Sequence, residues 1–163
     1  MKYIFYNDFE IKSEDYKSVD WSGANGFCFD SEGKVAIVWE EEKGEWNLPG
    51  GGREGNENPK ETFKREVLEE AQCEAVDIKY FHCVYAKAYD TNGNEVPVSE
   101  NSVCFRFVCK LDNIQEFISR KDGMEIDERK FVTLEELPQY ITWLEDTENG
   151  KASLQMLKDI ISK

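Results

Sequence analysis

The segment from Gly51 to Cys73, which reads GGREGNENPKETFKREVLEEAQC, constrains the fold and chemistry of this chain more than any other. At 100° per residue, a helix would place Glu66, Glu69 and Glu70 within about 100° of one another, on one face. The opposite side can pack against a core because it carries the apolar residues Phe63, Val67, Leu68 and Ala71. The segment therefore predicts an amphipathic helix with one carboxylate-rich face.

The start of this helix is encoded in the local sequence. Asn58 can cap it, Pro59 suits the first helical position, and Glu61 completes the spacing of a capping box. The end is less well specified, because Gln72 stands where a glycine would be the usual left-handed terminator. We therefore expect a helix that begins at Pro59 and ends near Gln72.

Three glutamates at this spacing repel one another, and each such pair destabilises a helix by roughly 0.2–0.5 kcal/mol. A bound cation would offset the repulsion, and hard carboxylate oxygens favour Mg²⁺, or Mn²⁺ as its near substitute. The usual zinc ligands are missing, since the chain has a single histidine, His82, and no Cys-x-x-Cys pair. The alternative is that the glutamates form a solvated helix face, as charge runs commonly do.

These residues resemble the Nudix box, the signature of the Nudix hydrolase family. The matching positions are Gly51, Glu57, Arg65, Glu66, Val67, Glu69 and Glu70, and they are preceded by Trp46, Leu48, Pro49 and Gly50. Two positions depart from the box, because Gln72 replaces its glycine and Cys73 replaces its terminal aliphatic residue. The resemblance implies an α/β (α+β) fold, a Nudix-like α/β/α sandwich around a mixed β-sheet.

The resemblance also implies an activity, the hydrolysis of a nucleoside diphosphate linked to another group, with water attacking one phosphorus. Glu57 and Arg65 match a pair that braces the loop against the helix. The metal would stabilise developing negative charge and lower the pKa of a bound water. The implied metal-binding set is Gly50, through its carbonyl, with Glu66, Glu69 and Glu70.

Catalysis of this kind usually needs a base or water-orienting group, and a glutamate on a loop facing the box helix is the expected source. Glu125, Asp127 and Glu128 are candidates because they lie just before an expected strand. Two alternatives stay open. These residues can be solvated loop carboxylates, or Glu66 itself can be the base while its two glutamate neighbours hold the metal.

The stretch around Trp143 offers a hint about the substrate. Trp143, Glu145 and Asp146 resemble a segment of family members that cleanse oxidised purine nucleotides, in which a tryptophan and acidic neighbours bind the base. A tryptophan can stack on a base while a carboxylate reads its edge. The alternative is that Trp143 packs the last helices together. His82, Tyr85 and Tyr89 could also line a pocket, with core or surface packing as the default interpretation. Lys87 and Arg106 could contact phosphate or be exposed to solvent.

Length and composition fit one small catalytic domain, residues 1–163, because 40% of the residues are hydrophobic and 13% aromatic. A formal net charge of −14 argues against a nucleic acid polymer as partner, but not against a small nucleotide. No membrane span or secretory signal is evident, so we expect a cytoplasmic protein with reduced cysteines. The sequence leaves a monomer and a homodimer equally open.

The rest of the chain predicts strands and helices that mix without strict βα alternation. Expected strands are 3–11, 26–29, 34–39, 75–89, 103–111 and 130–133, with a hairpin turn at 30–33 and a polar connection at 13–22. Expected helices after the box are 134–140, interrupted by Pro138, and 152–162. A mixed sheet sandwiched between helices follows from this pattern.

The predicted function is therefore a Mg²⁺-dependent pyrophosphohydrolase, with a nucleoside triphosphate or an oxidised purine nucleotide as substrate. One alternative is a hydrolase of ADP-ribose or a dinucleoside polyphosphate. Another is a non-catalytic nucleotide-sensing domain on the same fold, although all the box carboxylates are present. A pyrophosphate-isoprenoid isomerase would call for more histidine ligands than this chain has.

Overall fold

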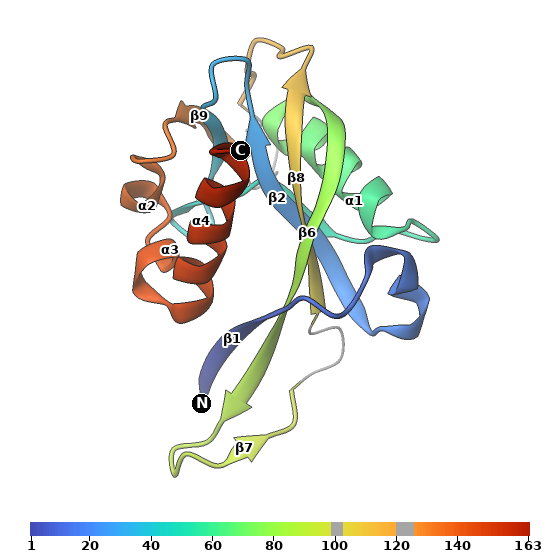
Figure 1. Ribbon diagram of the computed structural model, residues 1–163, viewed down its shortest axis with the longest axis vertical. Coiled ribbons are helices and arrows are strands. Elements are labelled where there is room, and N and C mark those ends of the chain that lie inside the picture. The colour runs from blue at the N-terminus through green and yellow to red at the C-terminus, as the bar shows by residue number, and fades with distance from the viewer. Residues whose placement is uncertain (99–102, 120–125) are drawn as a thin grey trace.

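The computed structural model describes residues 1–98, 103–119 and 126–163, and in them a mixed sheet lies between two layers of helices (Figure 1). The strands are β1 (Lys2–Asp8), β2 (Trp21–Phe29), β3 (Val35–Glu40), β4 (Glu45–Asn47), β5 (Gly50–Gly52), β6 (Glu74–Tyr89), β7 (Glu95–Val96), β8 (Val103–Asp112) and β9 (Ile126–Val132). The helices are α1 (Pro59–Glu66), α2 (Leu137–Tyr140), α3 (Trp143–Asp146) and α4 (Glu148–Ile161), with a 3₁₀ helix at Ser13–Ser18 and a π-helical turn at Val67–Ala71. The expected sandwich with a mixed sheet is confirmed.

The strand order places the glycine-rich β5 beside the centre of the sheet. The order is β1-β6-β8-β2-β3-β4, with β5 paired to β2, β7 to β6 and β9 to β3. Strands β2 and β8 are parallel, whereas the other pairs are antiparallel. In this register Asn25 of β2 lies between Arg106 of β8 and Gly50 of β5.

Each face of the sheet has its own apolar core. The core under α1 contains Phe63 and Val67 of that helical segment, together with Phe105 and Phe107 of β8. Figure 1 shows α1 on one side of the sheet and α2, α3 and α4 on the other. The second core lies under these three helices and includes Ile37, Leu137, Ile141, Leu144 and Leu157. Because α1 docks by its apolar side, its glutamate face is turned away from the core.

The expected hairpin is confirmed, but β2 begins at Trp21, earlier than the sequence pattern predicted. Its sequence, WSGANG, has the low β-propensity of a loop. The glycines are needed for close backbone approach: a Cβ on Gly23 would lie 2.1 Å from the Gly51 carbonyl oxygen, and one on Gly26 2.3 Å from that of Phe107. The first half of β2 is therefore a strand because it pairs closely with β5 and β8, although its own β-propensity is low.

The C-terminal helices differ from the prediction at their starts. Pro138 lies in the first turn of α2, so it begins the helix rather than interrupting it. Helix α4 starts at Glu148 instead of Ala152, because the Thr147 side chain caps it by accepting a hydrogen bond from the Gly150 N–H.

The predicted start of α1 is confirmed. Asn58 Oδ1 accepts a hydrogen bond of 2.8 Å from the Glu61 N–H, and Glu61 Oε1 accepts one of 3.2 Å from the Asn58 N–H. Pro59 follows as the first helical residue. This capping box fixes where the helix begins, so the glycine loop before it has a defined end.

The helix ends at Gln72, which adopts the left-handed conformation with φ 55° and ψ 44°. A residue with a Cβ is strained there, and hydrogen bonds offset the strain. Gln72 Nε2 donates to the Ile118 carbonyl at 2.8 Å, and Gln72 Oε1 accepts from the Ile118 N–H at 2.9 Å. The side chain thus ties the segment after β8 to the end of the box helix.

The prediction that Leu68 packs against the core is wrong, because its side chain is 50% exposed. Leu68 lay at the edge of the apolar arc on a regular helical wheel. The turn from Val67 to Ala71 is π-helical, and this wider turn shifts side-chain directions away from the regular spacing. Val67 and Ala71 are buried as expected.

Two further sequence expectations can be compared with the described residues. All five cysteines are free thiols, in agreement with the expectation of reduced cysteines. No helix in the described parts of the chain combines the length and apolarity needed to cross a bilayer.

Candidate active site

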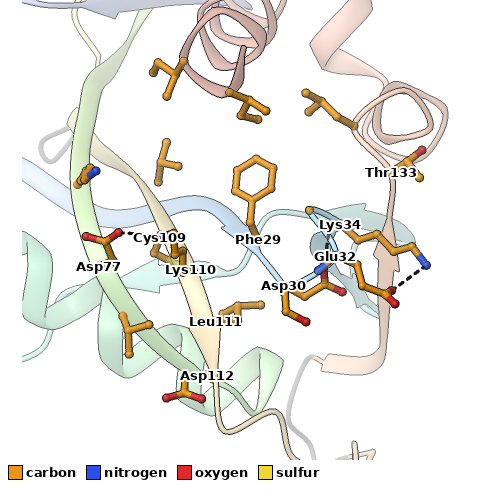
Figure 2. Close-up of a pocket in the computed structure, with 18 of the residues that line it drawn as sticks. Phe29, Asp30, Glu32, Lys34, Asp77, Cys109, Lys110, Leu111, Asp112 and Thr133 are labelled. Carbon is orange, nitrogen blue, oxygen red and sulfur yellow. Dashed lines mark hydrogen bonds and ion pairs between the residues drawn. The ribbon is translucent and has the colours of Figure 1, made fainter. Parts of the chain in front are cut away.

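One cavity, about 880 Å³, lies away from the glutamate helix (Figure 2). It opens between the β2–β3 turn, the ends of β6 and β8, and the last turn of α4, with Phe29 at its centre. Charged side chains on its rim pair with one another, Lys34 with Glu32 at 3.4 Å and Lys110 with Asp77 at 3.6 Å. Size alone therefore does not identify the reactive site.

A second cavity, about 470 Å³, is lined by three of the residues proposed from the sequence as metal ligands, Gly50, Glu66 and Glu70. It lies where the glycine strand β5 faces α1 and the end of β3. Its wall also includes Asn25 and Cys104 from the centre of the sheet. Its charged and metal-ligand candidates are Glu40, Lys43, Gly50, Glu66 and Glu70.

Arg65 organises the carboxylates at the edge of this cavity. It binds Glu57 through Nε at 2.7 Å and Nη2 at 3.0 Å, and its Nη2 also donates to the Gly52 carbonyl at 2.8 Å. Its Nη1 reaches Glu66 at 2.7 Å and Glu69 at 3.2 Å. The Arg65 hydrogen bonds hold the pKa of Glu57 at about 2. Arg65 thus connects Glu57 with the Gly52 carbonyl of β5, and the part that this pair plays in catalysis stays a prediction.

Glu66 lies directly against Gly51. A Cβ at position 51 would be 2.6 Å from the Glu66 carboxyl carbon, so only glycine leaves room for this side chain. Burial raises the pKa of Glu66, while the hydrogen bond from Arg65 opposes that rise. The carboxylate is therefore held in a narrow space between β5 and Arg65.

Glu70 is the least compensated carboxylate of the cavity. Its Oε2 atom is buried and has no hydrogen-bond partner in the described structure. Burial, followed by the nearby charges of Glu66 and Glu40, raises the pKa of Glu70 to about 9. A backbone hydrogen bond from Gly50 opposes this rise. A buried oxygen surrounded by like charge is the environment in which a divalent cation gives the largest stabilisation.

The three glutamates do not converge on one point in this structure. In the parts of the chain that are described, no group of three or more His, Cys, Asp or Glu side chains is arranged to hold a metal ion. Arg65 draws Glu69 and Glu66 toward itself, whereas Glu70 points into the cavity. The donor set is nevertheless suited to Mg²⁺, because it consists of carboxylate and carbonyl oxygens around a cavity.

Among the loop candidates for a catalytic base, the structure describes only the side chain of Glu128. Glu125 and the side chain of Asp127 fall outside the described residues. Glu128 is exposed and is paired in register with Trp39, so it shares the Trp39 face of the sheet and does not line the carboxylate cavity. Its role as a base stays a prediction.

The sequence analysis did not identify Glu40, which lies one residue beyond the expected strand 34–39. It is the last residue of β3, is only 7% exposed, and lines the cavity with Glu66 and Glu70. The signal that could have identified it is the alternation along β3, in which Glu40 follows the buried Ala36 and Val38 on one face.

Trp143 and Asp146 lie on the short helix α3, on the other side of the sheet from α1. The Trp143 indole is half-buried and covers the guanidinium of Arg106, whose Cζ atom is 4.9 Å from the ring centroid. Arg106 is 4% exposed and donates from Nε to Asn25 Oδ1 at 3.0 Å, and Asn25 lines the cavity. Asp146 and Glu145 are exposed. Trp143 is thus connected to the carboxylate cavity through two side chains.

The other pocket candidates have structural partners. His82 is buried and hydrogen-bonded to Ser153 Oγ at 3.0 Å and to the Cys83 carbonyl at 2.9 Å. Tyr85 stacks on Tyr6, and Tyr89 is within 3.3 Å of the Tyr6 hydroxyl. Lys87 pairs with Glu95 at 3.5 Å. These groups belong to the packing of β1, β6, β7 and α4.

A family model described as the NUDIX domain matches residues 21–154, which include β2, β5, α1 and α3. Together with the mixed sandwich and the carboxylate cavity, this match defines a hydrolase that acts on diphosphate bonds. The chain belongs to the Nudix family. A comparison with curated protein sequences found no match.

Solved structures with this fold include several hydrolases. The Bacillus subtilis pyrophosphohydrolase BsRppH, crystallised as a mutant, is 18% identical with a TM-score of 0.70, over 95% of this chain and 90% of that chain. A Caenorhabditis elegans Ap4A hydrolase complex is 13% identical with a TM-score of 0.59, over 86% and 98%. A NUDIX hydrolase from Nitrosomonas europaea is 17% identical with a TM-score of 0.54, over 82% and 84%. At these identities the likeness concerns the fold.

Proposed function

We propose that the protein is a Mg²⁺-dependent pyrophosphohydrolase of a nucleoside triphosphate or an oxidised purine nucleotide. The observation that carries the proposal is the buried, unpartnered Oε2 atom of Glu70 beside Glu66 and the glycine strand. A solvated helix face would not bury a carboxylate oxygen in this way. Mn²⁺ is the expected substitute for Mg²⁺.

The proposed metal-binding residues are Gly50, through its carbonyl, with Glu66, Glu69 and Glu70. When bound, Mg²⁺ would supply charge stabilisation on the phosphates and an acidified water. Glu57 and Arg65 fix the glycine loop and the first helical turns, so the cavity is organised before substrate arrives. The base is proposed to be Glu66, Glu125 or Glu128.

The substrate-binding side is proposed to include Trp143 and Asp146. Arg106 supports this assignment, because its buried guanidinium connects Trp143 to Asn25 at the cavity wall. The Arg106 guanidinium therefore places a positive charge between Trp143 and the carboxylate cavity. This arrangement suits a ligand that is negatively charged at one end and aromatic at the other. The proposed partner is a small nucleotide in the cytoplasm, not a nucleic acid polymer or a membrane.

A substrate panel tests the proposal directly. The purified protein is assayed with Mg²⁺ against nucleoside triphosphates, 8-oxo-purine nucleotides, ADP-ribose, dinucleoside polyphosphates and nucleotide sugars. We expect pyrophosphate release from a triphosphate and no turnover after chelation of the metal. Hydrolysis of only ADP-ribose or dinucleoside polyphosphates would favour the alternative hydrolase, and binding without hydrolysis of any of them would favour a sensing domain.

Replacement of Gly51 by Ala is expected to lower turnover by about a hundredfold, because misplacing a catalytic group by about 1 Å has an effect of this size. The new Cβ would meet the Glu66 carboxyl carbon at 2.6 Å. Gly52→Ala is the matched control, since its Cβ would meet only the Ser22 carbonyl oxygen at 3.9 Å. Equal rates for the two variants would show that the position of Glu66 is unimportant for hydrolysis.

Replacement of Trp143 by Ala is expected to raise KM for a purine nucleoside triphosphate by about tenfold, as loss of roughly 1.4 kcal/mol of stacking would do. The turnover number should change less, because Trp143 is remote from the proposed metal ligands. Trp143→Phe retains an aromatic ring over Arg106 and is expected to recover most of the affinity. If Trp143→Ala binds the nucleotide as tightly as wild type, Trp143 only packs the helices.

A further inference from the structure

Glu40 is a buried carboxylate that lies outside the box motif, residues 51–73. It ends β3, and Val38 on the same face of that strand packs into the core under α1. The alternation of side chains along a strand therefore directs Glu40 toward the α1 face. Consistent with this direction, it lines the same cavity as Glu66 and Glu70.

Glu40 adds a carboxylate to the lining of this cavity. Its side chain is only 9% exposed, and it lines the cavity together with Glu70, whose buried Oε2 atom has no hydrogen-bond partner in the described structure. Two like charges close together and largely removed from water are unfavourable unless a cation joins them. Part of this charge is met by Lys43, whose Nζ atom is 3.0 Å from Glu40 Oε2.

The Lys43 ammonium reaches the cavity from solvent. Its side chain is 58% exposed, whereas that of Glu40 is 9% exposed, so the cation is the mobile member of the pair. An exposed lysine can leave a carboxylate at small cost, since exposed ion pairs contribute about 0–1 kcal/mol. A divalent cation between Glu40 and Glu70 would replace this weak contact by two stronger ones.

We propose that Glu40 is an additional carboxylate of the metal-binding site, acting directly or through a metal-bound water, and that Lys43 is its replaceable counter-ion. The proposal rests on the function proposed above. It also gives Lys43 a second position, because the ammonium displaced by the metal remains in the cavity where the substrate phosphates are expected.

Titration calorimetry with Mn²⁺, in the absence of nucleotide, tests this assignment without measuring activity. We expect Glu40→Gln to weaken metal binding by about tenfold or more, the effect usual for a residue that supports a metal site. Glu42→Gln is the matched control, because Glu42 is an exposed neighbour in the same acidic run. It should bind Mn²⁺ like wild type.

Lys43→Gln provides a second and opposite readout. If Lys43 competes with the metal for Glu40, its removal should tighten Mn²⁺ binding in the wild-type background and have no effect in the Glu40→Gln background. Weaker binding by Lys43→Gln alone, or the same gain in both backgrounds, would overturn the counter-ion role. Thermal unfolding of each metal-free variant confirms that it is folded.

The failure of this inference differs from that of the proposed function. Wild-type affinity in Glu40→Gln, with metal binding intact in the wild type, would remove Glu40 from the site and leave the box carboxylates unaffected. Absence of Mn²⁺ binding by the wild type would instead refute the metal-dependent function, and this inference with it.

Discussion

Replacement of Glu70 by Gln is expected to lower turnover of the substrate by about a thousandfold, because losing several kcal/mol of metal-assisted stabilisation has that effect. Glu70 carries the buried oxygen without a hydrogen-bond partner, and glutamine has the same shape without the charge. Steady-state rates with Mg²⁺ measure the effect. Glu74→Gln, a change in a glutamate just beyond the helix, is the control and should keep the wild-type rate.

The same variant should be more stable than the wild type when metal is removed. The folded pKa of Glu70 is raised from 4.5 to about 9, so the folded state holds a proton that the unfolded chain releases at neutral pH. Stability contributed by this group is present below pH 4.5 and is lost as pH rises toward about 9. Metal-free wild type should therefore show a falling Tm across this range, and Glu70→Gln a smaller fall. Parallel Tm curves would contradict the burial of this carboxylate.

Replacement of Arg65 by Met is expected to lower the free energy of unfolding by about 3 kcal/mol, as removal of one member of a largely buried ion pair does. The side chains of Arg65 and Glu57 are 20% and 19% exposed, and the variant leaves Glu57, Glu66 and the Gly52 carbonyl without their shared donor. For a chain of this length, Tm should fall by about 6–12 °C. Turnover should fall as well, because the glycine loop is no longer held.

Lys64→Met provides the control for that experiment. Lys64 is the exposed neighbour of Arg65 on α1, so its Tm and rate should stay near those of wild type. Arg65→Lys should recover only part of the stability, because an ammonium cannot reproduce the fork that binds both Glu57 oxygens and the Gly52 carbonyl. Equal stability of Arg65→Met and Lys64→Met would show that the network contributes little.

The part of the fold best predicted from sequence is the box helix. Its start depends on hydrogen bonds within four residues, Asn58 to Glu61, and such local chemistry is visible in the sequence. The alternation of apolar residues likewise predicted β8 and most of β6. The combination of Glu57, Arg65 and the three glutamates indicated the fold and the class of reaction because these residues act at short separations.

The features that sequence analysis missed depend on residues distant in the chain. The strand from Trp21 was unrecognised because its glycines are required by Gly51 and Phe107, on other strands. Glu40 lay outside the expected strand 34–39, and its burial arises from packing against the α1 side of the sheet. The two hydrogen bonds between the Gln72 side chain and the Ile118 backbone join residues 46 positions apart, which no local pattern encodes.

The parallel pairing of β2 with β8 also determines when this protein can fold during synthesis. β2 needs β8, whose pairing residues begin at Val103, before the middle of the sheet exists. Strand β1 then pairs with β6 and is contacted by α4, where Asn7 Nδ2 donates to Ser153 Oγ at 3.2 Å. Such distant contacts form late because a long loop must close first. Until β8 has been synthesised, β2 therefore lacks its parallel partner, and the growing polypeptide exposes an unpaired sheet edge.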